Sequence, residues 1–416
     1  MSWTPEVTVT IDGRNLTGST LETVRITRGR EDVFAEPRAS YCLAELIDLD
    51  GLGLGIRPLQ LMQVTMKDSA GISRPVFTGT VSDTSAVLYD AGEVDNTPKA
   101  IVTVIATGPL ARLNRRVVAT GGRPEEKDGD RIAALIAEAL GTTWEEAGGT
   151  WATTGTATTT WETFDPDLDL DRIDQPGIFD IAALDANEFG YSALSQSYLT
   201  SNSARGILVD TPDGFVEYTD GNSRAATIAD VGFTDIPASN ILAGVLNPVS
   251  TQSDVVNRVF VEFDGGTVVF TNSDSLVQNG LLAAQFETNL ANSANAEAWA
   301  LDYLEDHAIP VVKLTQVGFR LDGLGDTVRD QVITADVNDA INLSGLPRTL
   351  GVARNFPAFV EGVELRLNRI TAEVILTISD AALSVGSQQW QQVTASITWN
   401  DVSATLRWEQ AAEVTT

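Results

Sequence analysis

Short apolar runs separated by turn signals fill the first hundred residues, and this pattern constrains the fold more than any other feature. Alternating apolar and polar residues predict strands, and interruptions at such short intervals leave no room for long helices. The turn signals are Asp12-Gly13, Asp50-Gly51, Asp68 to Gly71 and Asp95 to Pro98. The predicted strands are Val7–Ile11, Thr23–Thr27, Tyr41–Leu49, Leu59–Met66, Val76–Val81 and Ala100–Ala106. We therefore expect a sandwich or small barrel in this region.

The length of the chain predicts more than one domain. A chain of 416 residues exceeds the size at which a single hydrophobic core stops growing, so we expect two or three domains. Threonine-rich patches and 34 glycines favour strands and turns. The fold class expected is mainly β with α+β parts.

Helical patterns begin where the composition changes, near Gly108. Between Asp128 and Gly141 apolar residues repeat at helical spacing, Asp128 can cap the start, and Gly141 can supply a left-handed stop. A second helix is predicted at Ile178–Phe189.

Residues 254–307 predict a strand followed by a helix. Apolar residues lie on both faces of Asp254–Asp264, which is typical of a strand covered on both sides, so we place it inside a domain. Asn292 and Ser293 precede a helix at Ala296–Leu304. Other strands are predicted at Gly206–Asp210 and Phe215–Tyr218, joined by a turn, and at Val311–Leu321, Asp326–Ile333 and Val363–Ile378.

The formal charge of −30, from 27 basic and 57 acidic side chains, argues against a tight grip on nucleic acid. Such a grip comes from clustered Lys and Arg that neutralise phosphates. An acidic surface instead repels polyanions and would let nucleic acid pass without sticking.

Catalytic and metal-binding residue types are scarce. The single cysteine, Cys42, excludes an intramolecular disulfide, and the single histidine, His307, disfavours a histidine-dependent triad. We interpret His307 as a capping residue whose partial positive charge suits the end of the 296–306 helix. The aspartates between Asp165 and Asp174 invite a calcium interpretation, but the glycine and glutamate of a calcium loop are missing, so we favour a solvated acidic loop. We therefore expect no cofactor, no metal site and no enzymatic activity.

Tryptophans gather in two stretches. Trp144, Trp151 and Trp161 lie in the Thr- and Gly-rich segment 142–163, and Trp390, Trp399 and Trp408 lie in a short repeat near the C-terminus. Packing across strands is the simpler interpretation, and anchoring of a partner is the alternative.

The basic residues of the first β region form one cluster, Arg25, Arg28, Arg30 and Arg38. A solvated strand and loop would explain it. The sharper hypothesis is that these arginines contact an acidic surface on a neighbouring subunit.

The order of these parts resembles the tail hub, or minor tail protein, family of long-tailed bacteriophages, which is similar in design to the baseplate hub of contractile tails. The resemblance rests on stretches spread over most of the chain up to about residue 380. They are Val7–Gly13 with Val24–Ile26, Pro75–Val81, Ala106–Leu113, Gly206–Tyr218, and Asp254–Val259 with the helix that follows.

The resemblance implies two β-barrel-like tube domains around an α/β domain, with a C-terminal β extension. The implied boundaries are 1–110 and 251–380 for the barrel-like domains, 111–250 for the α/β domain with its insertion 142–163, and 381–416 for the extension. It further implies a homo-trimer at the tail tip that adapts a six-fold tube to three-fold symmetry. Distal tail and other tail-tip proteins and the tape-measure protein would be its partners, and DNA would pass through it without specific binding.

This interpretation implies a virion protein that is made in the host cytoplasm. Met1–Glu6 shows no basic leader followed by an apolar core, and no apolar run approaches the length of a membrane span, so we expect no membrane anchor. Two alternatives remain open. One is a tail adhesin that binds carbohydrate or a receptor through the tryptophans, and the other is a six-fold distal tail ring protein.

Overall fold

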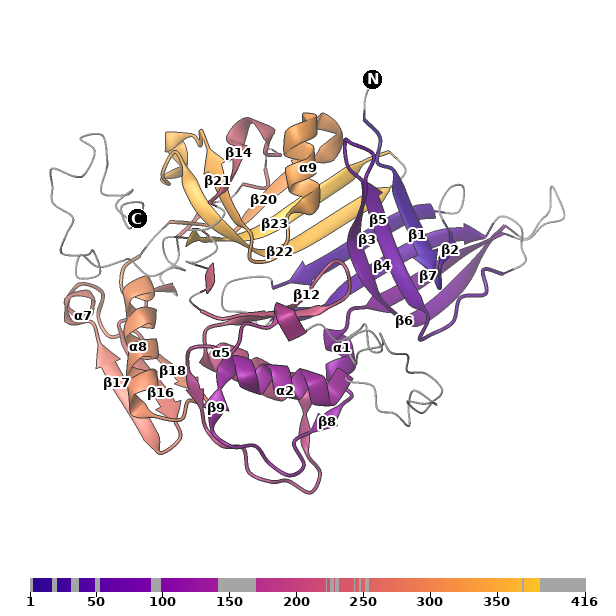
Figure 1. Ribbon diagram of the computed structural model, residues 1–416. Helices are drawn as coiled ribbons and strands as arrows, with labels where there is room; N and C mark the ends of the chain where they lie inside the picture. Colours follow the sequence, from indigo (N-terminus) through magenta and orange to yellow (C-terminus); the bar gives the residue numbers. More distant parts are fainter. Residues whose placement is uncertain are drawn as a thin grey trace.

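A computed structural model gives the structure of the chain (Figure 1). It describes residues 3–16, 21–30, 37–48, 53–90, 99–140, 170–221, 223–224, 228, 232–242, 244–246, 248–250, 254–310, 312–368 and 370–381. The predicted contacts Trp144, Trp151, Trp161, Trp390, Trp399 and Trp408 lie outside these residues.

A twelve-stranded sheet, here called the large sheet, forms the upper part of the molecule in Figure 1. Its main path runs β14-β21-β22-β3-β4-β7-β6-β5-β1-β2, and β23 pairs with both β22 and β20. All pairs are antiparallel except β14 with β21. The strands are β1 Val7–Ile11, β2 Arg14–Asn15, β3 Leu21–Gly29, β4 Arg38–Asp48, β5 Leu61–Lys67, β6 Ser73–Asp90, β7 Lys99–Thr107, β14 Thr234–Pro237, β20 Gln316–Arg320, β21 Ala340–Ser344, β22 Phe356–Asn368 and β23 Ala372–Asp380.

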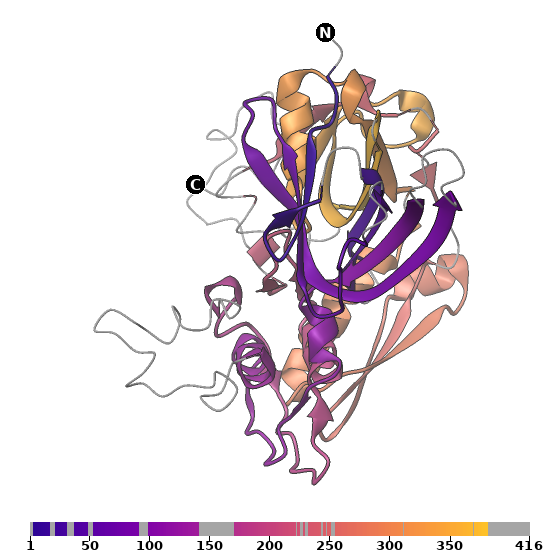
Figure 2. The same ribbon diagram turned by 90° about the vertical axis from the view of Figure 1, so that its right-hand side faces the viewer.

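The large sheet contains an N-terminal strand group, β1 to β7, and a C-terminal strand group, β14 and β20 to β23. The two strand groups join through β3 and β22. The register pairs Gly29 with Gly362 and Ile26 with Leu365, so segments more than three hundred residues apart become neighbours. Alternate residues point into one hydrophobic core that both strand groups share. Figure 2 shows the indigo and purple N-terminal strands curving around the yellow C-terminal strands.

The chain leaves the large sheet after β7 and again after β14, and it passes through β15 (Pro248–Val249) before the second excursion. Both excursions form what we call the lower body, residues 108–140, 170–221 and 254–310 (Figure 1). Its first part packs α1, α2 and α5 against the β12–β13 hairpin around a second core. Its second part packs α8 on a three-stranded sheet in which β16 lies between β17 and β18.

The elements of the lower body are mostly short. The first part contains α1 Leu110–Leu113, β8 Val117–Val118, β9 Glu126–Lys127, α2 Asp128–Leu140, the 3-10 turn η1 Leu170–Arg172, β10 Asp180–Ile181, β11 Tyr191–Ser192, α5 Ala193–Ser203, β12 Ile207–Asp210 and β13 Val216–Thr219. The second contains β16 Arg258–Phe263, β17 Gly266–Thr271, α7 Ser273–Asn279, β18 Ala283–Glu287 and α8 Ser293–His307. Beyond the lower body lie the 3-10 turns η2 Ala238–Asn240, η4 Leu321–Gly323 and η5 Arg348–Leu350, the strand β19 Lys313–Leu314 and the helix α9 Asp326–Thr334.

The mainly β class is confirmed, and so are the N-terminal strands, α2, α8 and the β12–β13 hairpin. Closed barrels are not seen among the described residues, because the large sheet runs from β14 to β2 without its ends pairing.

Two predicted elements are wrong. Residues 178–189 form β10 and irregular chain, and the helix begins only at Ala193, after Ser192 caps it. Asp326–Ile333 is not a strand but most of α9, whose Val332 and Ile333 are buried against the large sheet.

His307 does not supply the expected positive charge at the end of α8. Burial lowers the pKa of its imidazole to about 4, so the ring is neutral near pH 7. The ring stacks on Tyr303, and its Nδ1 lies 2.8 Å from the Tyr303 carbonyl oxygen. None of the helices in the described ranges has the length and apolar character needed to cross a membrane.

Candidate functional site

The β12–β13 hairpin is a part of the lower body that contacts the large sheet, and it forms the centre of a polar junction (Figure 1). Its outer face meets the loop that follows α9, where Val337 packs against Ile207 and Val209. Asn338 adds a side-chain hydrogen bond of 3.2 Å from its Nδ2 to the Thr219 hydroxyl oxygen.

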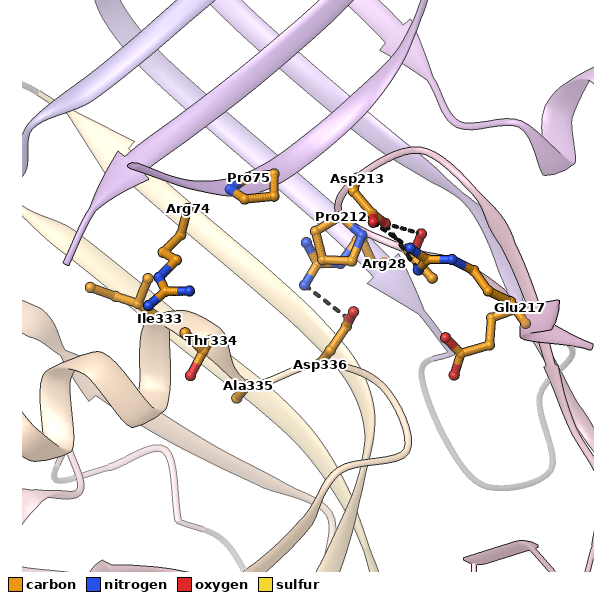
Figure 3. Close-up of a pocket in the computed structure, with 12 residues that line it drawn as sticks. Arg28, Arg74, Pro75, Pro212, Asp213, Glu217, Ile333, Thr334, Ala335 and Asp336 are labelled. Carbon is orange, nitrogen blue, oxygen red and sulfur yellow. Dashed lines mark hydrogen bonds and ion pairs between the residues drawn. The ribbon is translucent and has the colours of Figure 1, made fainter. Parts of the chain in front are cut away.

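A pocket of about 270 Å³ opens at this junction (Figure 3). It is lined by residues of β3 and β6, by η1 and the hairpin, and by the end of α9 with the loop that follows, so regions distant in sequence contribute to one cavity. The lining residues are Arg28, Arg74, Pro75, Arg172, Thr211, Pro212, Asp213, Glu217, Ile333, Thr334, Ala335 and Asp336.

Each arginine of the pocket already has a carboxylate partner. Arg28, which is buried, pairs with Asp336 at 3.1 Å and also donates to the Val76 carbonyl oxygen. Arg172 pairs with Asp213 at 2.6 Å. Arg74 pairs with Asp68, outside the pocket, at 3.0 Å.

Carboxyl groups are in excess around Arg28. The pKa of Glu217 is raised to about 7, mainly by burial. The charges of Asp336, Asp174 and Asp339 also raise this pKa, and the charge of Arg172 lowers it. Burial likewise raises the pKa of Asp339 to about 6, with a smaller contribution from Asp336. The pKa of Asp336 is also raised by burial, although Arg28 offsets part of this effect.

Glu361 forms a second polar centre, where β22 meets β3. Its side chain is completely buried. Its carboxylate accepts two hydrogen bonds from Arg224, at 2.8 and 2.9 Å, and one from Arg30 at 2.7 Å. The Ser379 hydroxyl of β23 also donates to it. Burial alone would raise the pKa of Glu361, but the charges of Arg224 and Arg30 hold it far below its ordinary value.

Two further buried carboxyl groups fasten the hairpin to its surroundings. Asp210 of β12 accepts hydrogen bonds from the backbone N–H of Ser40 at 2.7 Å and of Leu110 at 2.8 Å. Burial raises the pKa of Asp210 to about 7. Asp128, at the start of α2, accepts a hydrogen bond of 2.6 Å from the Tyr218 hydroxyl of β13.

The ion pairs of this arrangement join parts of the chain. They connect β3 to the loop after α9, η1 to the hairpin turn, and the segment after β13 to β22. Within the described ranges, no group of three or more His, Cys, Asp or Glu side chains is placed to bind a metal ion.

The predicted arginine cluster is placed at the seam between the strand groups. Arg25 pairs with Glu364 of β22 at 2.7 Å, Arg28 and Arg30 have the partners given above, and the side chain of Arg38 is exposed at the start of β4. The structure therefore gives three of the arginines acidic partners within the same chain. Contact of the cluster with a neighbouring subunit stays a prediction, as do the tryptophan contacts.

The sequence interpretation missed the acidic half of the site. Asp336 and Glu361 stood in no motif, and the hydrogen bond from Arg30 to Glu361 joins residues 331 positions apart. The one available signal was a charged residue inside an apolar run, since Glu361 interrupts Phe359, Val360 and Val363.

Neither a protein-family model nor a curated protein matches the sequence significantly. Solved structures do match. The 43 kDa tail protein of prophage MuSo2 from Shewanella oneidensis has 13% sequence identity and a TM-score of 0.54, over 91% of this chain and 99% of that protein. A tail protein from Neisseria meningitidis has 12% identity and a TM-score of 0.57, over 92% of this chain and 98% of that protein.

At such identities the similarity is one of fold, and it spans nearly the whole length of each protein. The chain has the fold of these prophage tail proteins, and the resemblance to phage tail proteins predicted from the sequence is confirmed at that level.

Proposed function

We propose that the chain is a structural component of a phage tail tip. The observation that carries this proposal is the similarity of fold to two prophage tail proteins over more than nine-tenths of every chain compared. In the finer form of the proposal, three copies make a hub that closes or extends the tail tube and adapts its six-fold symmetry to a three-fold tip.

The two strand groups of the large sheet support the finer form. Each chain would contribute two tube-forming β units, so three chains would place six such units around one axis. We propose the domain boundaries expected from the sequence for these units, 1–110 and 251–380, with 111–250 between them and 381–416 as an extension. The barrel-like character of the units belongs to the same proposal.

The charge of the chain suits a conduit for DNA. Three chains at −30 each would carry −90, and acidic side chains around a central opening would repel the phosphate backbone. Distal tail proteins, other tail-tip proteins and the tape-measure protein are the partners proposed, and the virion is the proposed location. A role of this kind requires no catalysis.

The mass of the purified chain in solution, followed by particle averages from electron microscopy, tests the proposal. The expected species has three times the chain mass of 44.4 kDa and forms a three-fold ring with a central opening lined by acidic side chains. A six-fold ring would replace the hub by the distal tail ring alternative. If the protein binds glycans on an array and forms no ring, alone or with tail proteins, the adhesin alternative would be favoured over the hub.

A further inference from the structure

The hairpin β12–β13 docks on residues 335–339 through few contacts. The apolar part is limited to Val337 with Ile207 and Val209, and the polar part includes the bond between Asn338 and Thr219. A dock this small is stabilised by little burial, so one charged group placed in it can shift its equilibrium.

Glu217 is the charged group that faces this dock from the hairpin without a partner (Figure 3). Its carboxylate forms no hydrogen bond or ion pair with the residues that the structure describes. In the neighbouring loop, Asp336 and Asp339 carry like charges, and the η1 segment adds Asp174.

The cations near Glu217 are already engaged. Arg172, from η1, pairs with Asp213 in the hairpin turn, and Arg28, from β3, pairs with Asp336. Arg74, from β6, pairs with Asp68. The pocket lining contains three guanidiniums and three carboxylates, but Arg74 pairs with Asp68 outside the lining, which leaves Glu217 without a guanidinium of its own.

We propose that this junction is a proton-dependent latch, in which protonation of Glu217 fastens the β12–β13 hairpin to the 335–339 loop and deprotonation loosens it. The latch is a property of the single chain and does not depend on the tail function proposed above.

The direction follows from proton linkage. A carboxyl group whose pKa is higher in the docked state than in the open state takes up a proton on docking, so docking is favoured below the docked pKa. Since the pKa of Glu217 is raised from 4.5 to about 7, docking is most favoured below the ordinary glutamate pKa and weakens as the pH rises up to about 7. For one such group the docking equilibrium constant falls up to about tenfold between pH 6 and pH 8.

Hydrogen exchange measured by mass spectrometry tests the latch directly. Protection factors, corrected for the intrinsic effect of pH, are compared at pH 6 and pH 8 for peptides covering β12 and β13. We expect protection of the hairpin to fall up to about tenfold in the wild-type chain. In the Glu217→Gln variant this fall should be clearly smaller, and what remains is the contribution of Asp210, which lies on the same hairpin and also has a pKa raised to about 7.

Glu287→Gln is the matched control, because Glu287 is an exposed glutamate on β18, outside the pocket. This variant should keep the wild-type pH dependence. Equal hairpin protection at both pH values in the wild-type chain would overturn the proposal, and that comparison needs no variant to fold. A fall in Glu217→Gln as large as in the wild-type chain, removed instead by Asp210→Asn or Asp339→Asn, would assign the effect to one of those aspartates and also overturn the proposal.

Discussion

Glu361 connects three distant parts of the fold through its buried carboxylate, which accepts hydrogen bonds from Arg30, Arg224 and Ser379. It lies on β22 next to an irregularity in the pairing with β23, between Val360 and Gly362. From there it compensates Arg30, which follows β3, and Arg224, which follows the lower body. A buried carboxylate with this many donors compensates charges that would otherwise be isolated in the core.

Replacing Glu361 by Gln should destabilise the chain by about 3–5 kcal/mol, since two buried guanidiniums would lose their counter-charge. Urea unfolding followed by circular dichroism measures the change. The exposed Glu287→Gln variant should differ from wild type by less than about 0.5 kcal/mol. Equal midpoints for the two variants would show that the network adds nothing to stability.

Residues of this kind are also the hardest to find from a sequence. The run from Phe356 to Asn368 was identified in part as a strand because its apolar residues alternate. The need for a negative charge at Glu361 depends on Arg30 and Arg224, which only the folded chain brings near it. Periodicity indicates which face of a strand is buried, but it does not indicate which charged residue from a distant part of the chain lies next to that face.

At the scale of elements, the seam between β3 and β22 depends on two facing glycines. A Cβ atom at Gly29 would lie 2.3 Å from the Glu361 carbonyl oxygen, and one at Gly362 would lie 2.4 Å from the Arg30 carbonyl oxygen. The strands can approach this closely only without side chains at these positions.

Alanine at Gly29 should cost more than the same change at Gly13. Both glycines have left-handed φ angles, of 77° and 74°, so both variants carry a similar backbone penalty of about 1–2 kcal/mol. Gly13 has open space around it, whereas Gly29 faces the β22 backbone, which adds about 1–3 kcal/mol. Thermal unfolding of the two variants checks the difference, and equal losses would mean that the seam tolerates a side chain.

The contact between β13 and α2 depends on the hydrogen bond from Tyr218 to Asp128, which is buried at both ends. Tyr218→Phe should cost about 1.5–3 kcal/mol, because a carboxylate in the core loses a donor. Tyr191→Phe is the matched control, since the Tyr191 hydroxyl donates to the Asp185 carbonyl oxygen in an exposed setting. Urea midpoints should therefore fall clearly for the first variant and hardly for the second; similar shifts would contradict this account.

The elements that were predicted correctly are specified by their own residues, whereas those predicted incorrectly depend on contacts with other parts of the chain. Strands with strict alternation and the strongly amphipathic α2 carry their own signals. In residues 326–333 the apolar positions Val328, Val332 and Ile333 have helical spacing, but β-branched residues favoured a strand. Packing of this face on the large sheet decides the outcome in favour of a helix.

At the scale of the whole molecule, the order of units in space is not their order in the chain. Residues 254–310, which the sequence analysis placed inside a domain, form a peripheral part of the lower body, and the large sheet is assembled from strands that precede and follow them in the chain (Figure 1). Strand pairing between residues this distant gives no local signal. The resemblance to tail proteins was visible because it depends on the order of parts along the chain.

The same long-range assembly buries several carboxyl groups, and this sets how stability depends on pH. Burial raises the pKa of Asp210 and Glu217 to about 7 and of Asp306 and Asp339 to about 6. Groups with raised pKa values bind more protons in the folded chain than in the unfolded chain, so their contribution is present at low pH and is lost as the pH rises through 6 to 7. His307 opposes them only below about pH 6.5, where the unfolded chain binds its proton.

The free energy of unfolding, measured by urea denaturation, should therefore fall from pH 6 to pH 8. The slope is up to about 1.4 kcal/mol per pH unit for each carboxyl group that titrates in this range. Asp210 is buried and accepts hydrogen bonds from the backbone N–H groups of Ser40 and Leu110, and its pKa is raised to about 7 although the charge of Arg28 offsets part of the effect of burial. Asp210→Asn should therefore remove about one proton from this dependence and flatten the slope. A midpoint that rises over this range would mean that the folded chain keeps these carboxyl groups ionised. The fold would then have to compensate their charge by contacts other than those at the junction, because the guanidiniums there are already paired.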